Sequence, residues 1–409
     1  MKPDKNKEKG KALITPEDAW KIISDSVPVL KTERMSLSKA GRHVLSKDIY
    51  APLDMPPFDN SAMDGYIILH SDFGKGMRKF KVKDTLPAGN PKFRKPLLSG
   101  QAYRVFTGAL VPDGDHSIVI REQVKEGKNE IILFQETLDK GVHIRRQGQH
   151  LRKGDLALPK GHLLNPGSIG FLSGLGIDRV EVYKKPVVSL IITGDELLAP
   201  GQKVEKGMVF ESNSFALQAA LREAGIEPHS IVRVKDKQKL VVKAIREALR
   251  RSDLLLLTGG ISAGDYDFVK TSLPEAGVKC LFYKIAQKPG KPLFYGKKNK
   301  TRIFALPGNP ASVLTCFYEY VYPSIGRMMG KKFAYVEKRR IPLYASYEKN
   351  HTFALFLKSK MNETHIEILG GQQSDSMQSF AEADCLIYLP PGQKAYRKGD
   401  LVETHFIHR

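Results

Sequence analysis

Ser262, Asp265 and Asp267 lie in a loop that follows a run of four leucines and the pair Gly259-Gly260. Carboxylate and hydroxyl oxygens of this kind bind hard cations such as Mg²⁺. A short, wholly apolar run bounded by glycines predicts a strand that is buried on both faces, as in a parallel sheet covered by helices. Since ligands of open α/β sheets bind at the carboxyl ends of the strands, we expect chemistry in the loop 259–267.

Two other apolar segments end in the same way. The segment 187–192 leads into Thr193-Gly194-Asp195-Glu196, and the segment 303–306 leads into Pro307-Gly308-Asn309-Pro310. If the three strands are parallel neighbours, their loops converge on one edge of the sheet. Each loop alone could simply turn a strand into a helix. Three loops with this many polar residues favour a site.

Two lysines, Lys288 and Lys291, flank a Pro-Gly turn that is followed by Pro292. Ammonium groups that point at one spot repel each other, and an anion between them removes the penalty. The next glycine loop opens a helix, where the amides after Gly308-Asn309 and the hydroxyl of Ser312 could hold an oxyanion at the positive helix end. The alternatives are a solvated turn and an ordinary helix cap.

Acidic residues complete the set. Asp265 and Asp267 could bind Mg²⁺ with help from Glu196 of the neighbouring loop, although each could equally cap the following helix. The glycine spacing matches neither a Walker A loop nor a Rossmann fingerprint. The residues alone therefore predict an anion and metal site for phosphate chemistry, without naming a substrate.

The elements that must position these residues fall into several segments. The expected fold class is α/β plus β modules, with a central doubly wound α/β domain and two small β-barrel-like domains. The expected segments are a disordered basic tail at 1–11, a discontinuous helical and extended domain at 12–50 and 150–184, a small β domain at 51–149 that carries DNSAMDGY, the α/β domain at 185–331, and a C-terminal β-barrel domain at 332–409.

Local signals predict where the helices lie. Thr15 begins a helix that ends near Ser26, because Pro and two acidic residues follow it. Residues 161–184 have helical character, and Asp236 is expected to cap a helix that runs to Arg250. A further helix is expected at 311–328, and none after it.

The totals limit the class of protein. A chain of 409 residues needs more than one domain, and no apolar run is long enough to span a membrane. The net charge of +21 suits anionic ligands, but the lysines are dispersed and lack interleaved aromatic residues, so nucleic acid is not expected as the main partner. Three scattered cysteines and an amino terminus without an apolar signal region predict a cytoplasmic protein.

Five segments together resemble one family. These are residues 57–66 (PFDNSAMDGY), 193–197 (TGDEL), 258–267 (TGGISAGDYD), 288–292 (KPGKP) and 306–310 (LPGNP). They occur in the order and spacing of the MoeA family, the molybdopterin molybdenumtransferases, which include the gephyrin E domain. The similarity covers nearly the whole chain after residue 12.

The resemblance implies an elongated homodimer that inserts molybdate into adenylylated molybdopterin in a Mg²⁺-dependent reaction and releases AMP. It implies that molybdate lies against Ser262, Asp267, Lys288, Lys291, Pro292 and Ser312. It further implies that the β module with Asp64 and Thr107 reaches the α/β site of the other subunit. Other proteins of cofactor biosynthesis are candidate partners.

The chain departs from the family pattern at three places. Where the family usually has Gly-Glu-Asp after an arginine pair, this chain has Gln147-Gly148-Gln149-His150. It has Lys235 where an aspartate pair is common. No arginine stands around Phe353, where the family has one, and Lys358 lies nearby. These changes motivate an alternative function, a paralogue that binds molybdopterin or molybdate, or acts as a scaffold, without efficient turnover.

Overall fold

The structure is a computed structural model that describes residues 13–89, 96–261, 268–331 and 336–407 of the 409-residue chain. The chain forms two compact units. Unit 1 comprises Met1–Glu33, Arg42–Ser46 and Glu181–Arg409, and unit 2 comprises Arg34–Gly41 and Lys47–Val180. Within the described ranges no helix combines the length and the apolar character that crossing a bilayer requires.

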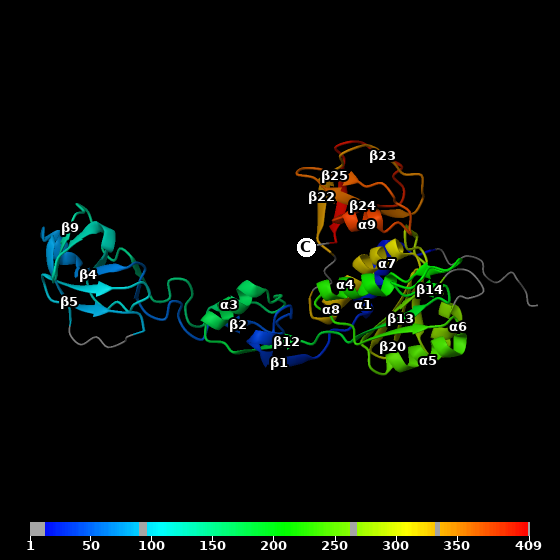
Figure 1. The fold of residues 1–409 in the computed structure, drawn as a ribbon, viewed down its shortest axis with the longest axis horizontal. Helices are drawn as coiled ribbons and strands as arrows, with labels where there is room; N and C mark the ends of the chain where they lie inside the picture. Colours follow the sequence, from blue (N-terminus) through cyan, green and yellow to red (C-terminus); the bar gives the residue numbers. More distant parts are fainter. Residues whose placement is uncertain (1–12, 90–95, 262–267, 332–335, 408–409) are drawn as a thin grey trace, which may run out of the picture. The chain divides into compact units, whose positions relative to one another are not determined.

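A six-stranded mixed sheet forms the centre of unit 1 (Figure 1). Its strands in spatial order are β16 (Ser230–Val234), β13 (Val188–Thr193), β17 (Leu254–Thr258), β21 (Thr301–Leu306), β20 (Phe294–Lys298) and β18 (Lys279–Tyr283). The first four strands pair in parallel, and β20 pairs antiparallel with both β21 and β18. Since β13, β17 and β21 are parallel neighbours, the prediction that their loops meet at one edge is confirmed.

The leucine run of β17 is buried on both faces of this sheet, as predicted. Leu254 and Leu256 pack into one apolar cluster, and Leu255 and Leu257 pack into another. This alternation follows from the two-residue period of a strand. Helices cover both faces of the sheet, so the apolar side chains of β17 are shielded from water on either face.

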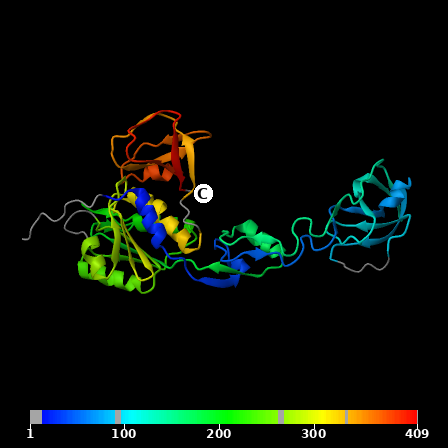
Figure 2. The same cartoon turned by 180° about the vertical axis from the view of Figure 1, so that it is seen from behind.

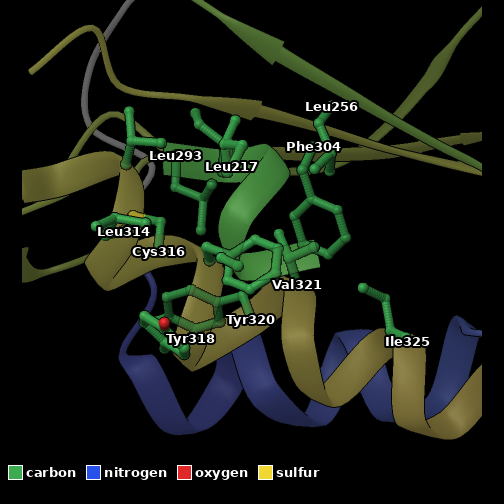
Figure 3. Close-up of a cluster of buried hydrophobic side chains, with 14 of the residues drawn as sticks. Leu217, Leu256, Leu293, Phe304, Leu314, Cys316, Tyr318, Tyr320, Val321 and Ile325 are labelled. Carbon is green, nitrogen blue, oxygen red and sulfur yellow. The ribbon is translucent and has the colours of Figure 1, made fainter. Parts of the chain in front are cut away.

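Three helical segments cover one face of the sheet. They are α1 (Pro16–Ser26), α4 (Asn213–Glu223) and the continuous segment formed by α7 (Pro310–Cys316), the π-helical turn η3 (Phe317–Val321) and α8 (Tyr322–Met328). Figure 3 shows Leu217 of α4 close to Leu256 and Phe304 of the sheet. The blue helix α1 lies beside the yellow α8 in Figure 2 as well as in Figure 1. The expected helix 311–328 is therefore present but contains a π-helical turn.

The other face is covered by α5 (Gln238–Leu249) and α6 (Phe268–Glu275). The prediction that Asp236 caps α5 is wrong, because the residue before the helix is Lys237 and makes no side-chain cap. Asp236 instead accepts a hydrogen bond from the backbone N–H of Asp195. A tertiary partner has thus replaced the local cap.

The predicted start of the first helix is confirmed. The hydroxyl of Thr15 accepts from the N–H of Asp18, and the Asp18 carboxylate accepts from the N–H of Thr15, which forms a capping box. Trp20 of this helix is buried in the core, where its indole N–H donates to the carbonyl of Glu319. The helix is therefore part of unit 1.

The C-terminal module, residues 336–407, contains a second six-stranded sheet in unit 1. Its strands are β19 (Gln287–Lys288), β24 (Ala354–Met361), β26 (Cys385–Leu389), β28 (Leu401–Phe406) and β22 (Lys338–Pro342) in spatial order, with β25 (Ile366–Ile368) paired to β24. The edge strand β19 belongs in sequence to the α/β segment. The turn at residues 288–292, which carries Lys288 and Lys291 and which we call the lysine turn, therefore begins in the sheet of this module. The expectation of no helix after residue 331 is wrong, because α9 (Gln378–Glu382) forms one short turn.

Unit 2 contains a third six-stranded sheet. Its spatial order is β7 (His116–Ile120), β4 (Gly65–Leu69), β6 (Gln101–Val105), β5 (Lys79–Leu86), β9 (Glu130–Leu133) and β8 (Val124–Glu126). The short helical elements are α2 (His70–Gly74), α3 (Pro166–Gly174), η1 (Leu37–Lys39) and η2 (Arg121–Gln123). Asn165 caps α3 as the Asn-Pro signal predicts.

The prediction of helical character through residue 184 is wrong beyond α3, because β12 (Arg179–Tyr183) is a strand with Val180 and Val182 buried. The remaining short strands pair as β1 (Thr32–Ser36) with β12, β2 (Ile49–Tyr50) with β11 (Leu156–Leu158), β3 (Asn60–Ser61) with β10 (Ile144–Arg145), β14 (Leu197–Leu198) with β15 (Val209–Phe210), and β23 (Tyr347–Glu348) with β27 (Ala395–Tyr396).

Candidate active site

A pocket of about 410 Å³ opens at the carboxyl ends of β13, β17 and β21 in unit 1. Four segments of the chain, each of which carries predicted site residues, form part of its wall. The predicted residues that line it are Glu196, Gly259, Gly260, Lys288, Lys291, Pro292, Gly308, Asn309 and Ser312. The pocket is also lined by Asp236, Gln287 and Ser374, which the sequence did not suggest as site residues.

The glycine pair lets the loops after β17 and β13 touch. Gly259 has φ of +86°, a left-handed conformation that a side chain disfavours. A Cβ at this position would overlap the carbonyl oxygen of Thr193 and lie 2.8 Å from its hydroxyl. The close approach of these two loops therefore requires glycine at position 259.

Gly259→Ala is expected to destabilise the protein by roughly 2–4 kcal/mol, because backbone strain and overlap add. Gly308→Ala is the matched control, since no described atom lies within 4 Å of its Cβ and its φ is not left-handed. That variant is expected to stay within about 0.5 kcal/mol of the parent. Thermal unfolding of both variants tests this, and equal stability of the two would show that the loop contact is not tight.

Carboxylates gather on the β13 side of the pocket. Asp195 and Asp236 exchange two hydrogen bonds of 3.2 Å, in which each backbone N–H donates to the other carboxylate. Burial raises the pKa of Asp236, and the negative charges of Asp195 and Glu196 raise it further, against hydrogen bonds from the Asp195 backbone and the Thr193 side chain that lower it. Oδ1 of Asp236 is buried and lies outside the bond from Asp195, which goes to Oδ2. A cation placed here would relieve the repulsion and partner this oxygen.

Gln287, which is fully buried, holds the lysine turn in place. Its amide nitrogen donates to the carbonyl of Pro289 at 2.9 Å, and its amide oxygen accepts from the hydroxyl of Tyr320. Tyr320 comes from the π-helical turn η3. The core therefore helps to hold the turn, through Gln287 and Tyr320.

The two ammonium groups of the turn reach one pair of stacked rings in the C-terminal module. Lys288 Nζ lies 3.3 Å from Nε2 of His351, and Lys291 Nζ lies 5.3 Å from the ring centre of Phe353. The ring centres of His351 and Phe353 are 6.1 Å apart. The turn thus brings two positive charges to the same side of the pocket.

Ser374 of the C-terminal module closes the pocket at the amino end of α7. Its carbonyl accepts from the backbone N–H groups of Ala311 and Ser312 at 3.1 and 3.3 Å. Its hydroxyl oxygen accepts from the side-chain amide of Asn309 at 2.6 Å. The expectation that these helix amides hold an oxyanion therefore needs correction for Ala311 and Ser312, because a protein carbonyl already occupies them. The hydroxyl hydrogen of Ser374 is not used in the bond from Asn309 and can serve a ligand.

Two signals could have suggested the missed residues. Ser374 lies in a run of polar residues, 372–376, directly after Gly370-Gly371. Gln287 interrupts the apolar residues that precede the lysine turn. Both residues act through contacts with segments distant in sequence, and local patterns do not show such contacts.

The predicted residues of the first β module lie in unit 2. Thr107 donates to the Asp64 carboxylate from its backbone N–H at 2.7 Å and from its hydroxyl at 2.8 Å. These bonds lower the pKa of Asp64, which therefore carries a negative charge at neutral pH. The two residues form one local unit with an exposed carboxylate.

The departures from the family pattern have structural partners in this chain. Gln149 accepts from the N–H of Arg146 at 3.1 Å, and the guanidinium of Arg146 forms an ion pair of 2.6 Å with Asp59. The ammonium of Lys358 is bonded to backbone carbonyls and does not point into the pocket as a free cation. Gln149 and Lys358 thus both hold loops in place.

Ser262, Asp265 and Asp267 lie outside the described residues. Among the described residues there is no group of three or more His, Cys, Asp or Glu side chains that could hold a metal ion. The described part of a cation site is limited to the carboxylates of Glu196 and Asp236, both of which line the pocket.

Comparison with known families covers almost the whole chain. The model of the MoeA N-terminal region (domain I and II) matches residues 14–176, that of the probable molybdopterin binding domain matches residues 189–327, and that of the MoeA C-terminal region (domain IV) matches residues 340–407. The α/β domain thus lies in sequence between β-rich domains, as the predicted fold class requires.

Individual relatives agree with these matches. A molybdopterin molybdenumtransferase of Haemophilus influenzae is 31% identical over 401 residues, which cover 95% of this chain and 98% of that protein. One of Staphylococcus epidermidis is 30% identical over 399 residues, with 96% and 95% covered. The solved molybdopterin biosynthesis moeA protein of Pyrococcus horikoshii OT3 is 28% identical with a TM-score of 0.81, and the match covers 97% of this chain and 100% of that one. This chain belongs to the MoeA family of molybdopterin molybdenumtransferases.

Proposed function

We propose that this chain inserts molybdate into adenylylated molybdopterin in a Mg²⁺-dependent reaction that releases AMP. Family membership makes it a transferase of molybdenum cofactor biosynthesis, and the substrates and the Mg²⁺ dependence are the proposal. The observation that carries the proposal is one pocket with two lysines on one side and two carboxylates on the other. Such a site can hold an oxyanion and a metal–phosphate group next to each other.

The lysine side of the pocket is the proposed molybdate site. Lys288 and Lys291 supply positive charge, and Pro292 shapes the end of their turn. Ser312 and Ser374 supply hydroxyl groups, and the glycines Gly259, Gly260 and Gly308 keep the wall free of side chains. From the sequence we add Ser262 to this set. Fixed donors of this kind stabilise anionic charge without reorganising during the reaction.

The carboxylate side is the proposed Mg²⁺ site, with Glu196, Asp236, Asp265 and Asp267 as the residues that would hold the ion. The oxygen donors fit Mg²⁺, and the buried Oδ1 of Asp236, beside the negative charges of Asp195 and Glu196, supports a cation here. When bound, the ion neutralises and polarises phosphate oxygens. The protein groups orient the adenylylated pterin so that its phosphoanhydride lies between the carboxylate and lysine sides.

A homodimer in the cytoplasm is part of the proposal. In this arrangement Asp64 and Thr107 of one copy complete the pocket of a second copy. The charged carboxylate of Asp64, fixed by two bonds from Thr107, supports a role toward a cation or a substrate proton. Other proteins of cofactor biosynthesis are proposed as partners, and nucleic acid is not.

A second candidate function is a paralogue that binds molybdopterin or molybdate without efficient turnover. The presence of Gln149 and His150 at positions where the family usually has acids favours it. Both side chains are exposed, so an acid at either position could be accommodated without disturbing the core. Gln149→Glu with His150→Asp is therefore a direct test of whether these positions limit activity.

AMP release from adenylylated molybdopterin tests the proposed function. We expect release that requires both molybdate and Mg²⁺ and that is lost in a Lys288→Ala, Asp267→Ala variant. Absence of release by the parent chain, with pterin binding retained and activity gained in the Gln149→Glu, His150→Asp variant, would establish the paralogue instead.

A further inference from the structure

A short segment of the C-terminal module reaches the pocket as a strap. We call residues 371–376 the Ser374 strap. Its contacts with the amino end of α7 connect it to the proposed molybdate site: the Ser374 carbonyl accepts from the N–H groups of Ala311 and Ser312, and the Ser374 hydroxyl oxygen accepts from the side-chain amide of Asn309. The position of Ser374 in the pocket therefore depends on the conformation of the strap.

The strap is organised around one buried ammonium group. Lys358 of β24 is 3% exposed, and its Nζ donates to the carbonyls of Gly371, Gln373 and Ser376 at 2.6, 3.1 and 2.9 Å. An ammonium has three donors, so all three are used on one strap. Lysine is rarely buried without such partners.

A second contact ties the strap to the same strand. The side-chain oxygen of Gln372 accepts from the backbone N–H of Lys358 at 3.0 Å, and its nitrogen donates to the Lys358 carbonyl at 2.8 Å. Two sets of hydrogen bonds therefore tie the strap to β24. One set joins the Gln372 side chain to the Lys358 backbone, and the other joins the Lys358 ammonium to the carbonyls of the strap. Burial lowers the pKa of Lys358, and the nearby charge of Asp375 acts in the opposite direction.

Removal of the ammonium would take the charged donor from three carbonyls, leaving Gly371 and Ser376 with the Ser379 hydroxyl and Gln373 with the backbone N–H of Ser376. Loss of a charged donor at a buried carbonyl is costly unless the group turns toward water or finds a new partner. Turning them outward requires a change in the backbone of the strap, and Ser374 lies between two of the three residues concerned. The amino end of α7 would then lose the carbonyl that satisfies its first N–H groups.

We propose that Lys358 is a positioning residue for the oxyanion site: it folds the Ser374 strap around its ammonium and so places Ser374 against Asn309 and Ser312. This inference rests on the proposed function for the identity of the oxyanion. Lys358 does not touch the anion, because its three donors are used by the strap. It therefore acts through Ser374.

Lys349 provides a matched control in the same module. It is 2% exposed, its pKa is also lowered by burial, and its ammonium donates to the carbonyl of Pro390; neither residue lines the pocket. Lys358→Met and Lys349→Met each remove one buried ammonium and keep the length of the side chain. Loss of general stability should affect both variants, whereas loss of the oxyanion site should affect only the first.

The first measurement is molybdate affinity of the full-length protein by titration calorimetry, well below the unfolding temperature of each variant. We expect the Kd to rise at least tenfold in Lys358→Met and less than twofold in Lys349→Met, with Lys358→Arg in between. Gln372→Met is a milder variant of the strap and is expected to shift the Kd in the same direction. Equal Kd values for the Lys358 and Lys349 variants would overturn the proposal.

The second measurement does not depend on the ligand. Amide hydrogen exchange of the peptide that contains Ala311 and Ser312 should accelerate in Lys358→Met but not in Lys349→Met, because Ser374 no longer accepts from these N–H groups. If the parent protein fails to bind molybdate, the proposed function fails while this exchange difference persists. If exchange is the same in both variants, the strap does not depend on Lys358.

Discussion

His405→Leu is expected to destabilise unit 1 by about 3–5 kcal/mol, the cost of removing one partner from a buried ion pair. Nδ1 of His405 lies 2.7 Å from Glu319 and Nε2 lies 2.8 Å from Glu403, and the side chains of His405 and Glu319 are fully buried. Lys338 forms an ion pair of 2.7 Å with Glu403. Without the imidazole, the Glu319 carboxylate would remain buried without its charged partner.

This network joins the α/β domain to the C-terminal module. Glu319 belongs to the π-helical turn η3, whereas Glu403 and His405 belong to β28 and Lys338 to β22. Trp20, the single tryptophan of the chain, lies 4.3 Å from the Lys338 ammonium, measured to its ring centre. Trp20 fluorescence therefore reports unfolding at the network. Denaturant unfolding followed by this fluorescence measures the expected loss of stability in His405→Leu.

The pH dependence of this loss has a defined sign. Burial lowers the pKa of His405, but attraction and hydrogen bonds from Glu319 and Glu403 outweigh it and the net pKa is raised. A raised pKa stabilises the fold fully below the ordinary histidine pKa of about 6.5, and this contribution is lost as the pH rises through the folded value. Hydrogen bonds from His405 and Lys338 lower the pKa of Glu403 to about 2, so its contribution is lost as the pH falls from about 4.5 toward that value.

The difference in stability between the parent and His405→Leu should therefore be largest between about pH 4.5 and 6.5 and shrink at higher pH. His365→Leu is a control, because this histidine is partly exposed and outside the network. It is expected to change stability by less than about 0.5 kcal/mol at any pH. A stability difference for His405→Leu that does not vary with pH would contradict the charged state assigned to this histidine.

Lys288→Ala and Lys291→Ala are each expected to raise the KM for molybdate by roughly 10- to 150-fold, which corresponds to a charged hydrogen bond of about 1.5–3 kcal/mol. Both side chains line the pocket. They lie on the edge strand β19 and the lysine turn, which Gln287 ties to the core. Neither side chain is needed for packing, since both are exposed. The double variant should lose more than either single variant, although the two effects need not add.

Lys300→Ala is the control for net charge. Lys300 is exposed in the turn before β21, at the opposite end of that strand from the pocket. Steady-state rates at varied molybdate concentration should show a KM within twofold of the parent for this variant. A similar rise of KM in all three single variants would mean that overall charge, not the turn, attracts the anion.

The part of the fold that follows from local patterns could be predicted from the sequence. The leucine run of β17 has no polar position, so only a strand covered on both faces can bury it. The Thr15 capping box depends on residues three positions apart and is therefore visible in the sequence. The meeting of three glycine loops at one edge follows from parallel neighbouring strands.

The parts that could not be predicted depend on contacts between distant segments. The lysine turn begins as an edge strand of the C-terminal module, and Ser374 of that module closes the pocket, yet neither contact has a local signature. Asp236 looks like a helix cap in sequence but bonds to Asp195, because the two loops meet in space. The strand β12 resembles a continuation of the helical segment in the sequence, because its two alternating valines, Val180 and Val182, follow only a short turn after α3.

The most direct test of the central claim is the molybdenum content of the pterin product. After a single turnover with adenylylated molybdopterin, molybdate and Mg²⁺, we expect one molybdenum atom on the pterin for each AMP released. The Lys288→Ala, Lys291→Ala variant should yield neither product at the same molybdate concentration. Release of AMP without molybdenum on the pterin, by the parent protein, would contradict the account, because the pocket would then hydrolyse the adenylate without inserting the metal.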